Sequence, residues 1–248
     1  MDLRAELADL PRLRSPSRWP GWEHVNGYVV HSLPFSSGHV LAVRVLPQND
    51  FAPYVTLWHR TPGGEWSIHV DAPSVEIACP RYFGPATRHV ARARIAVSWT
   101  GPNELRVRVD EPSLDLRVSV GASRPLRLLN ACHGAMPFVV RRSRVYARLM
   151  ELMARVMLDM GRITMEGTTP SGHRAVIMPT RILYVTDARA VLDGNDLGEP
   201  SRVATPPRIG EVGLPARPTF AVGGGFFRIL DPEEYQRTVE RLRADASP

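Results

Sequence analysis

The sequence predicts a mainly β protein in which an antiparallel meander closes into a barrel or a sandwich. Three observations lead to this prediction. In the first half of the chain, seven short apolar or alternating segments follow one another without an intervening helical pattern. Turn signals rich in Gly, Pro and Asn separate these segments. The 23 prolines among 248 residues also break the chain into pieces too short for a helical bundle.

The first elements in order are a short helix and the strands of a first β region. Residues 1–20 should form an amphipathic helix and a polar lead, because Leu3, Leu7 and Leu10 recur on one helical face. The barrel-like region covers residues 21–121. Its strands are expected at Gly27–Leu33, Val40–Leu46, Tyr54–Arg60, Glu65–Asp71, Arg88–Trp99, Glu104–Asp110 and Leu114–Val120.

A helical connection is expected over residues 122–161, with one main helix at Phe138–Met160 and Gly161 as its C-terminal cap. Apolar residues recur there at helical spacing. They are Val145, Leu149, Leu152, Met153, Val156 and Met160. Arginines on the other face would suit a membrane surface or a partner protein, but packing of a methionine-rich stripe against the barrel is the simpler interpretation.

A second, smaller β region is expected over residues 162–230, followed by a C-terminal helix over 231–248. Its strands are predicted near Arg162–Thr168, His173–Met178, Arg181–Thr186, Ala188–Leu192 and Thr219–Leu230. The stretch from Asp193 to Arg217 is rich in Pro and Gly, so we expect a long connection or a lid. Gly223–Gly225 lacks dinucleotide-binding spacing and indicates a bulge or a close backbone contact.

The composition excludes several kinds of chemistry. All 31 basic residues are arginine, so no Schiff-base lysine, P-loop lysine or Ser-Lys dyad is possible. Cys79 and Cys132 lack metal-ligand spacing; a disulfide between them is possible, and two reduced thiols are the simpler interpretation. We therefore expect no metal and no cofactor.

Charge and hydropathy bear on partners and location. The net charge of +6 allows an anionic partner, but the arginines alternate along predicted strands and no nucleic-acid motif occurs, so no nucleic-acid partner is expected. The N-terminus lacks the basic and apolar regions of a signal peptide, and no apolar run is long enough to span a bilayer. These features predict a cytoplasmic protein without a transmembrane segment, and they leave its oligomeric state open.

The segment from Tyr54 to Asp71 is predicted to be one β-hairpin with two different faces. A loop of two or four residues around Gly63 and Gly64 would place even-numbered residues of the first strand beside odd-numbered residues of the second. The apolar face would then carry Val55, Leu57, His59, Trp66, Ile68 and Val70. The polar and aromatic face would carry Tyr54, Thr56, Trp58, Arg60, Glu65, Ser67, His69 and Asp71.

This polar face is the candidate site. His69 and Asp71, two residues apart on one strand face, would form an imidazole–carboxylate pair for proton transfer. The expected substrate-binding residues are Tyr54, Thr56, Trp58 and Arg60. The pattern itself fits both a face that lines a cavity and a face that points to solvent.

The layout of the chain resembles the lipocalin-like group of carotenoid hydratases, tocopherol cyclases and fungal Diels-Alderases. The resemblance lies in a meander ending in GPNELRVRVDEPSLDLRVSV, a helical connection and a second β segment, and it brings no matched catalytic residue. It implies a cavity for a hydrophobic small molecule, such as an isoprenoid or a polyketide. It also implies cofactor-independent cyclisation, hydration or isomerisation, the work of an isomerase or a lyase of secondary metabolism.

Three functional hypotheses follow. The first is such an enzyme, and the second is a non-catalytic carrier or sensor of the same ligand class. The third is an interaction module that uses the arginine-rich surface and the helix at Met150–Met160.

Overall fold

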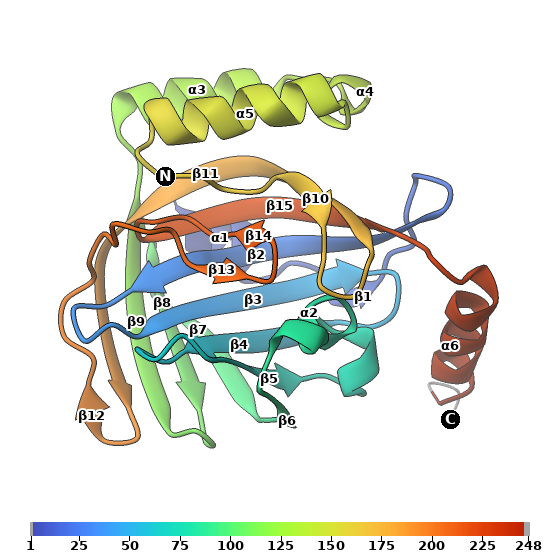
Figure 1. Ribbon diagram of the computed structural model, residues 1–248, viewed down its shortest axis with the longest axis horizontal. Helices are drawn as coiled ribbons and strands as arrows, with labels where there is room; N and C mark the ends of the chain where they lie inside the picture. The colour runs from blue at the N-terminus through green and yellow to red at the C-terminus, as the bar shows by residue number, and fades with distance from the viewer. Residues whose placement is uncertain (1, 246–248) are drawn as a thin grey trace.

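The computed structural model describes residues 2–245 and confirms a mainly β architecture (Figure 1). The strands are β1 (Leu13–Arg14), β2 (Trp22–Pro34), β3 (Val40–Asn49), β4 (Tyr54–Arg60), β5 (Trp66–Asp71), β6 (His89–Arg92), β7 (Ile95–Gly101), β8 (Glu104–Val109), β9 (Leu114–Gly121), β10 (Glu166–Thr168), β11 (Arg174–Leu192), β12 (Asn195–Asp196), β13 (Arg208–Ile209), β14 (Val212–Gly213) and β15 (Thr219–Arg228). The helices are α1 (Leu3–Leu7), α2 (Pro80–Phe83), α3 (Arg124–Gly134), α4 (Phe138–Arg141), α5 (Arg144–Val156) and α6 (Pro232–Asp245), with 3₁₀ turns at Val75–Ile77 and Gly84–Ala86.

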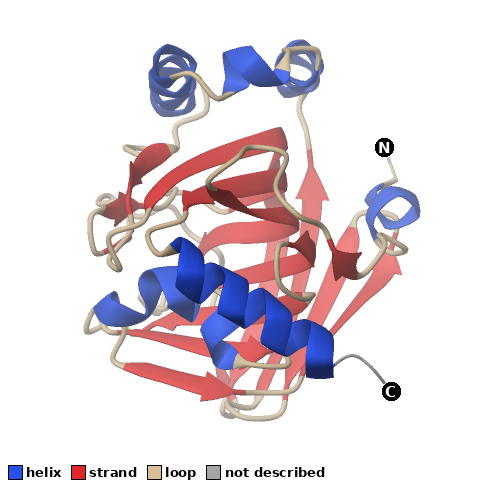
Figure 2. Cartoon of the chain, turned by 90° about the vertical axis from the view of Figure 1, so that its right-hand side faces the viewer, coloured by secondary structure: helices blue, strands red, loops and turns tan. Residues whose placement is uncertain are grey.

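Ten strands form one strongly curled sheet, a half-barrel (Figures 1 and 2). Their order is β6-β5-β4-β3-β2-β15-β11-β9-β8-β7. The short β1 pairs with β3, and the short β10 and β12 pair with β11. The short β13 and β14 form a second sheet of their own. Most neighbouring strands are antiparallel, as the meander predicts, whereas β5 and β6 are parallel.

The two predicted β regions join in this one sheet. β15, from the second region, lies between β2 and β11 and pairs with both. β11 is a single strand of 19 residues that pairs with β15 through Tyr184 and with β9 from Tyr184 onward. The boundary between residues 161 and 162 therefore divides the chain in sequence and does not divide the sheet.

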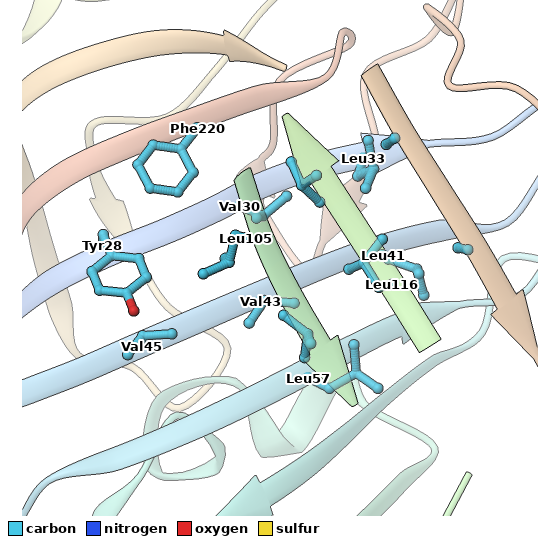
Figure 3. Packing of buried hydrophobic residues seen from close by; sticks show 14 of the residues in the cluster. Tyr28, Val30, Leu33, Leu41, Val43, Val45, Leu57, Leu105, Leu116 and Phe220 are labelled. Atoms are coloured by element: carbon cyan, nitrogen blue, oxygen red, sulfur yellow. The ribbon is translucent and has the colours of Figure 1, made fainter. Parts of the chain in front are cut away.

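The main core lies inside the curl. There β8 and β9 cross over β2, β3 and β4, and side chains such as Leu105 and Leu116 face Val30 and Val43 (Figure 3). The strand β3 is apolar on both faces, because Leu41, Val43 and Val45 enter this core while Val40, Ala42 and Leu46 enter a second one. A strand covered on both sides reads as a continuous apolar run, which matches its sequence VLAVRVL.

The connection over residues 122–161 is helical as predicted, but its helices differ from the expected one. The connection begins with α3, which was not predicted. The predicted helix at Phe138–Met160 is split into α4 and α5. Ser143 separates the two, and its side chain caps α5 by accepting from Tyr146 N at 3.2 Å. α5 ends at Val156, before Gly161.

The buried face of α5 matches the predicted one only in part. Ala147, Met150, Ala154 and the following Leu158 and Met160 are buried, against Ile182 and Met165 among others. Four residues of the predicted stripe are exposed, namely Val145, Leu149, Leu152 and Val156, whereas Met153 is partly buried and Met160 is buried as predicted. Two alanines on the buried face let the helix lie close to the molecule, and Met150 on the same face packs in one cluster with Met165.

The predicted C-terminal helix is confirmed. α6 begins after Asp231, whose Oδ1 accepts from Glu233 N and Glu234 N at 2.9 and 3.0 Å. Its Val239, with Tyr235 and Leu242, packs on Phe51 and Ile77.

Cys79 is a buried free thiol and Cys132 an exposed one, so the simpler interpretation of the two cysteines holds. Within residues 2–245, none of the helices has the length and apolarity needed to cross a bilayer.

The predicted faces of the hairpin are wrong, because its loop has an odd number of residues. Thr61 N donates to Glu65 O at 2.9 Å, which leaves Pro62–Gly64 as a three-residue loop. Gly64 has φ +95°, a conformation that this type of loop requires and that glycine adopts without strain.

The odd loop pairs even-numbered residues with even-numbered residues. Thr56 lies opposite Val70 and Trp58 opposite Ile68, so these four side chains share one face. His69 and Asp71 lie on the other face, opposite Leu57 and Val55. The predicted proton-transfer pair therefore does not share a face with Tyr54, Thr56, Trp58 and Arg60.

Candidate functional site

A cavity of about 120 Å³ lies on the face of β2, β3 and β4 that is opposite the main core. Strands β11 and β15 complete its walls, and the segments 160–165 and 212–215 cover it. Most lining side chains are apolar. They include Val25, Val29, Leu46, Phe83, Met160, Ile163, Met165, Ile177, Ile182, Val212, Leu214 and Phe227. Because Val212 and Leu214 belong to the Pro- and Gly-rich stretch after Asp193, this stretch covers the cavity as a lid would.

Arg44 is the charged residue that lines this cavity. It is 7% exposed, and its guanidinium carbon lies 3.4 Å from the centre of the Trp58 ring. Its Nη1 is buried without a hydrogen-bond partner, and it forms no ion pair within the described part of the chain. Burial lowers the pKa of Arg44 to about 10, so the side chain is still a cation at neutral pH.

A chain of polar contacts lies beside Arg44. The Tyr54 hydroxyl and Thr56 Oγ1 lie 3.7 and 3.6 Å from Cys79 Sγ, and Trp58 Nε1 donates to Thr56 Oγ1 at 3.1 Å. Tyr54 and Cys79 line the cavity. Burial, together with the neighbouring thiol, raises the pKa of Tyr54 well above its usual range, so its hydroxyl keeps its proton at neutral pH. It is therefore a potential hydrogen-bond donor to a ligand.

A buried ion pair fixes the wall that holds Cys79 and Phe83. Glu23, fully buried on β2, accepts from Arg81 Nε and Nη2 at 3.1 and 2.9 Å and from the Tyr82 hydroxyl. Arg81 and Tyr82 belong to α2, and Tyr82 stacks on Phe227 with ring centres 3.7 Å apart. These contacts hold α2 against β2 and β15. They thereby position Cys79 and Phe83, which line the cavity.

Three glycines of β15 form part of the cavity wall and allow neighbouring strands to approach closely. A Cβ on Gly223, which has φ +137°, would lie 2.6 Å from Thr180 N, and one on Gly224 would lie 2.5 Å from Val25 O. The register of β11 against β15 shifts at the same place, between Pro179 and Arg181. The predicted bulge and close backbone contact are thus both present.

His31 also lines the cavity, and it carries a prediction for pH dependence. Burial and the nearby Arg44 charge lower the pKa of His31 from 6.5 to about 3. Below pH 6.5 the unfolded chain binds a proton that the folded protein does not bind until about pH 3. The free energy of unfolding should therefore fall with decreasing pH, by at most about 1.4 kcal/mol per pH unit from this residue.

Urea unfolding at several pH values between 7 and 4 would measure this dependence. A His31→Gln variant should lose less stability over this range than the unmodified protein. Some dependence should remain, because burial also lowers the pKa of His59 and His173 to about 4. The same substitution at the exposed His89 serves as a control, and an equally steep loss in the His31 variant would contradict the prediction.

The predicted site residues divide into three groups. Tyr54 lines the cavity, and Thr56 and Trp58 are fully buried behind Cys79 and Arg44. Arg60 is partly exposed near the hairpin loop, where its Nη2 would be 3.2 Å from a Cβ on Gly64, and it does not line the cavity.

The last group is His69 and Asp71, on the opposite face. The His69 ring lies 6.1 Å from the ring of His89, its Nδ1 is buried without a hydrogen-bond partner, and burial lowers its pKa. Asp71 accepts from Ile95 N at 2.9 Å, a bond that joins β5 to β7. The two side chains are thus kept apart from the cavity.

Sequence reasoning missed Arg44, His31 and Cys79 as cavity residues. One signal was present for Arg44, because it is the single charged residue in the apolar run VLAVRVL of a strand covered on both faces. An arginine at such a position must be buried, and a buried arginine needs an anion. His31 and Cys79 carried no comparable signal.

Comparisons of the chain with protein-family models, curated proteins and solved structures find no match. The resemblance in layout to the lipocalin-like group, and the cytoplasmic location, stay predictions.

Proposed function

We propose that the protein binds a small, largely apolar organic anion, such as a carboxylic acid, with Arg44 as its anchor. The buried and unpaired guanidinium of Arg44 is the observation that supports this proposal most directly. A buried charge without a counter-ion is unfavourable, and a carboxylate can accept two parallel hydrogen bonds from a guanidinium. The apolar walls would then contact the rest of the ligand.

The size of the cavity limits the ligand. An engineered protein cavity of about 150 Å³ binds benzene, and the cavity beside Arg44 has about 120 Å³. A ligand of one ring or a short chain would fit it as it stands. An isoprenoid or a polyketide, the class implied by the resemblance, would require the covering segments 160–165 and 212–215 to move apart.

Cofactor-independent catalysis is part of the same proposal. The Tyr54 hydroxyl, which keeps its proton, would polarise the ligand by donating a hydrogen bond, and Arg44 would stabilise negative charge that develops on it. Such positioning and polarisation would promote cyclisation, hydration or isomerisation. A carrier or sensor would use the same anchor without forming a product, so product analysis after incubation with a bound acid separates the two.

Isothermal titration with matched pairs of probes tests the anchor. Benzoate and hexanoate should bind to the unmodified protein at least about tenfold more tightly than benzamide and hexanamide, because only the acids neutralise Arg44. An Arg44→Met variant keeps most of the side-chain volume and removes the charge. It should bind each acid no more tightly than its amide.

An Arg117→Met variant is the matched control, because Arg117 is exposed on β9 away from the cavity. This change should leave the preference for the acids unaltered. Equal binding of acids and amides by the unmodified protein, or a preference that survives Arg44→Met, would overturn the proposal. Thermal unfolding of both variants without ligand shows whether they fold.

A further inference from the structure

The helical layer, defined as residues 124–157 with the helices α3, α4 and α5, carries an exposed apolar stripe. On α5 the side chains of Val145, Leu149, Leu152 and Val156 are 80, 49, 56 and 71% exposed. Their spacing of four, three and four residues places them on one helical face. This face is opposite the buried one that contains Ala147 and Ala154, so it points away from the sheet.

The rest of the layer extends this surface. Figures 1 and 2 show the layer at one end of the molecule, above β11. Its other exposed apolar residues are Leu128, Met136, Val139, Val140 and the adjoining Met157. Nine of the twelve large hydrophobic side chains that are exposed within residues 2–245 belong to this one layer. Such a concentration is typical of a surface that meets another apolar phase.

The same segment carries the positive charge of the protein. Residues 124–157 contain seven arginines and one acid, Glu151, so their net charge of +6 equals that of the whole chain. Glu151 is already engaged, because its Oε1 accepts from Met165 N at 2.7 Å. Within the described residues Arg124, Arg127, Arg148 and Arg155 form no ion pair, so their charges are free to meet an anionic partner.

We propose that the helical layer docks on a membrane surface that contains anionic lipids. Aliphatic side chains would enter the boundary between headgroups and acyl chains, and the long arginine side chains would reach the phosphates. A nucleic acid would match the arginines but not the aliphatic stripe. Protein interfaces are enriched in aromatic residues, Met and Arg. The layer shares the arginines and two methionines with such interfaces, but its large exposed apolar residues include no aromatic one and are mainly Leu and Val.

Co-sedimentation of the full chain with vesicles tests this proposal. The protein should pellet with vesicles of phosphatidylcholine and phosphatidylserine, and far less with vesicles of phosphatidylcholine alone. A Leu149→Ser/Leu152→Ser variant should bind the mixed vesicles at least about tenfold more weakly. The control Leu13→Ser/Leu230→Ser makes the same change at two exposed leucines outside the layer and should bind normally.

The charge contribution has its own matched pair. Arg148→Gln/Arg155→Gln should weaken binding by about tenfold or more, because it removes two positive charges that would attract the anionic surface. Arg117→Gln/Arg189→Gln lowers the net charge equally on the outer face of β9 and β11 and should have little effect. Circular dichroism verifies the fold of each variant. If the Leu149→Ser/Leu152→Ser variant does not fold, Val145→Thr/Val156→Thr takes its place.

Two results would overturn the proposal. The first is equal sedimentation of the protein with both kinds of vesicle, or none with either. The second is a leucine variant that is folded and still binds as the unmodified protein does. Binding of duplex DNA that the arginine variant loses and the leucine variant keeps, without any binding to vesicles, would assign the surface to nucleic acid instead.

Discussion

Replacing Glu23 with alanine is expected to lower the free energy of unfolding by about 3 to 5 kcal/mol. The Glu23 side chain is fully buried and accepts from both Arg81 and Tyr82. Its removal would leave the Arg81 side chain, which is 11% exposed, with Glu234 as its remaining ion-pair partner at 3.3 Å. The buried Tyr82 hydroxyl would lose its acceptor as well. Urea unfolding at pH 7 measures the loss.

An exposed ion pair gives the matched control for Glu23. Glu65 contacts Arg88, and their side chains are 49 and 72% exposed. Glu65→Ala should change the free energy of unfolding by no more than about 1 kcal/mol, because water screens exposed charges. If the two alanine variants lost similar amounts, Glu23 would not be the residue that holds α2 in place. A Glu23→Gln variant, which retains one acceptor oxygen, should fall between the two.

The second large effect is expected for Trp58→Ala, at about 3 to 5 kcal/mol of lost stability. The Trp58 side chain is fully buried. Its ring lies under Arg44, and its centre is 4.8 Å from the Phe83 ring and 6.2 Å from the Trp66 ring. The substitution opens a large hole in the second core. It also removes the aromatic face on which the Arg44 guanidinium rests.

A Trp58→Phe variant separates a packing role from direct contact with a ligand. It retains a ring beneath Arg44 and loses the hydrogen bond from Nε1 to Thr56. We expect a smaller loss of stability than for alanine, with binding of benzoate preserved. Chemical unfolding and titration of the same samples check both points. A stable alanine variant that has lost only benzoate binding would show that Trp58 is a ligand contact and that its packing contributes little.

The strands β4 and β5 follow from the sequence, whereas the faces of their hairpin do not. Period-two alternation predicts β4 and β5 to within one residue, because successive side chains of a strand point to opposite faces of the sheet. The faces depend on whether the loop around Pro62–Gly64 has two, three or four residues. The local sequence permits all three, and a change of one residue moves every side chain of β5 to the other side.

The cavity and the exposed helix show a second limit. Arg44 and Tyr54 come together because β3 and β4 pair. The segments 160–165 and 212–215, which complete the cavity, lie far along the chain, and no local pattern indicates their approach. On α5, hydrophobicity favours Leu149 and Leu152 as buried residues over Ala147 and Ala154. The structure buries the alanines, because close approach of the helix requires small side chains.

The long strand β11 has a consequence for how the protein unfolds. Its first half supplies backbone hydrogen bonds to β15, and its second half supplies them to β9. Loss of this strand would expose the edges of both neighbours at once, and with them both apolar cores. The two β regions of the sequence should therefore not melt separately. We expect them to behave as one cooperative unit whose amide protons in β11 exchange with solvent only on global unfolding.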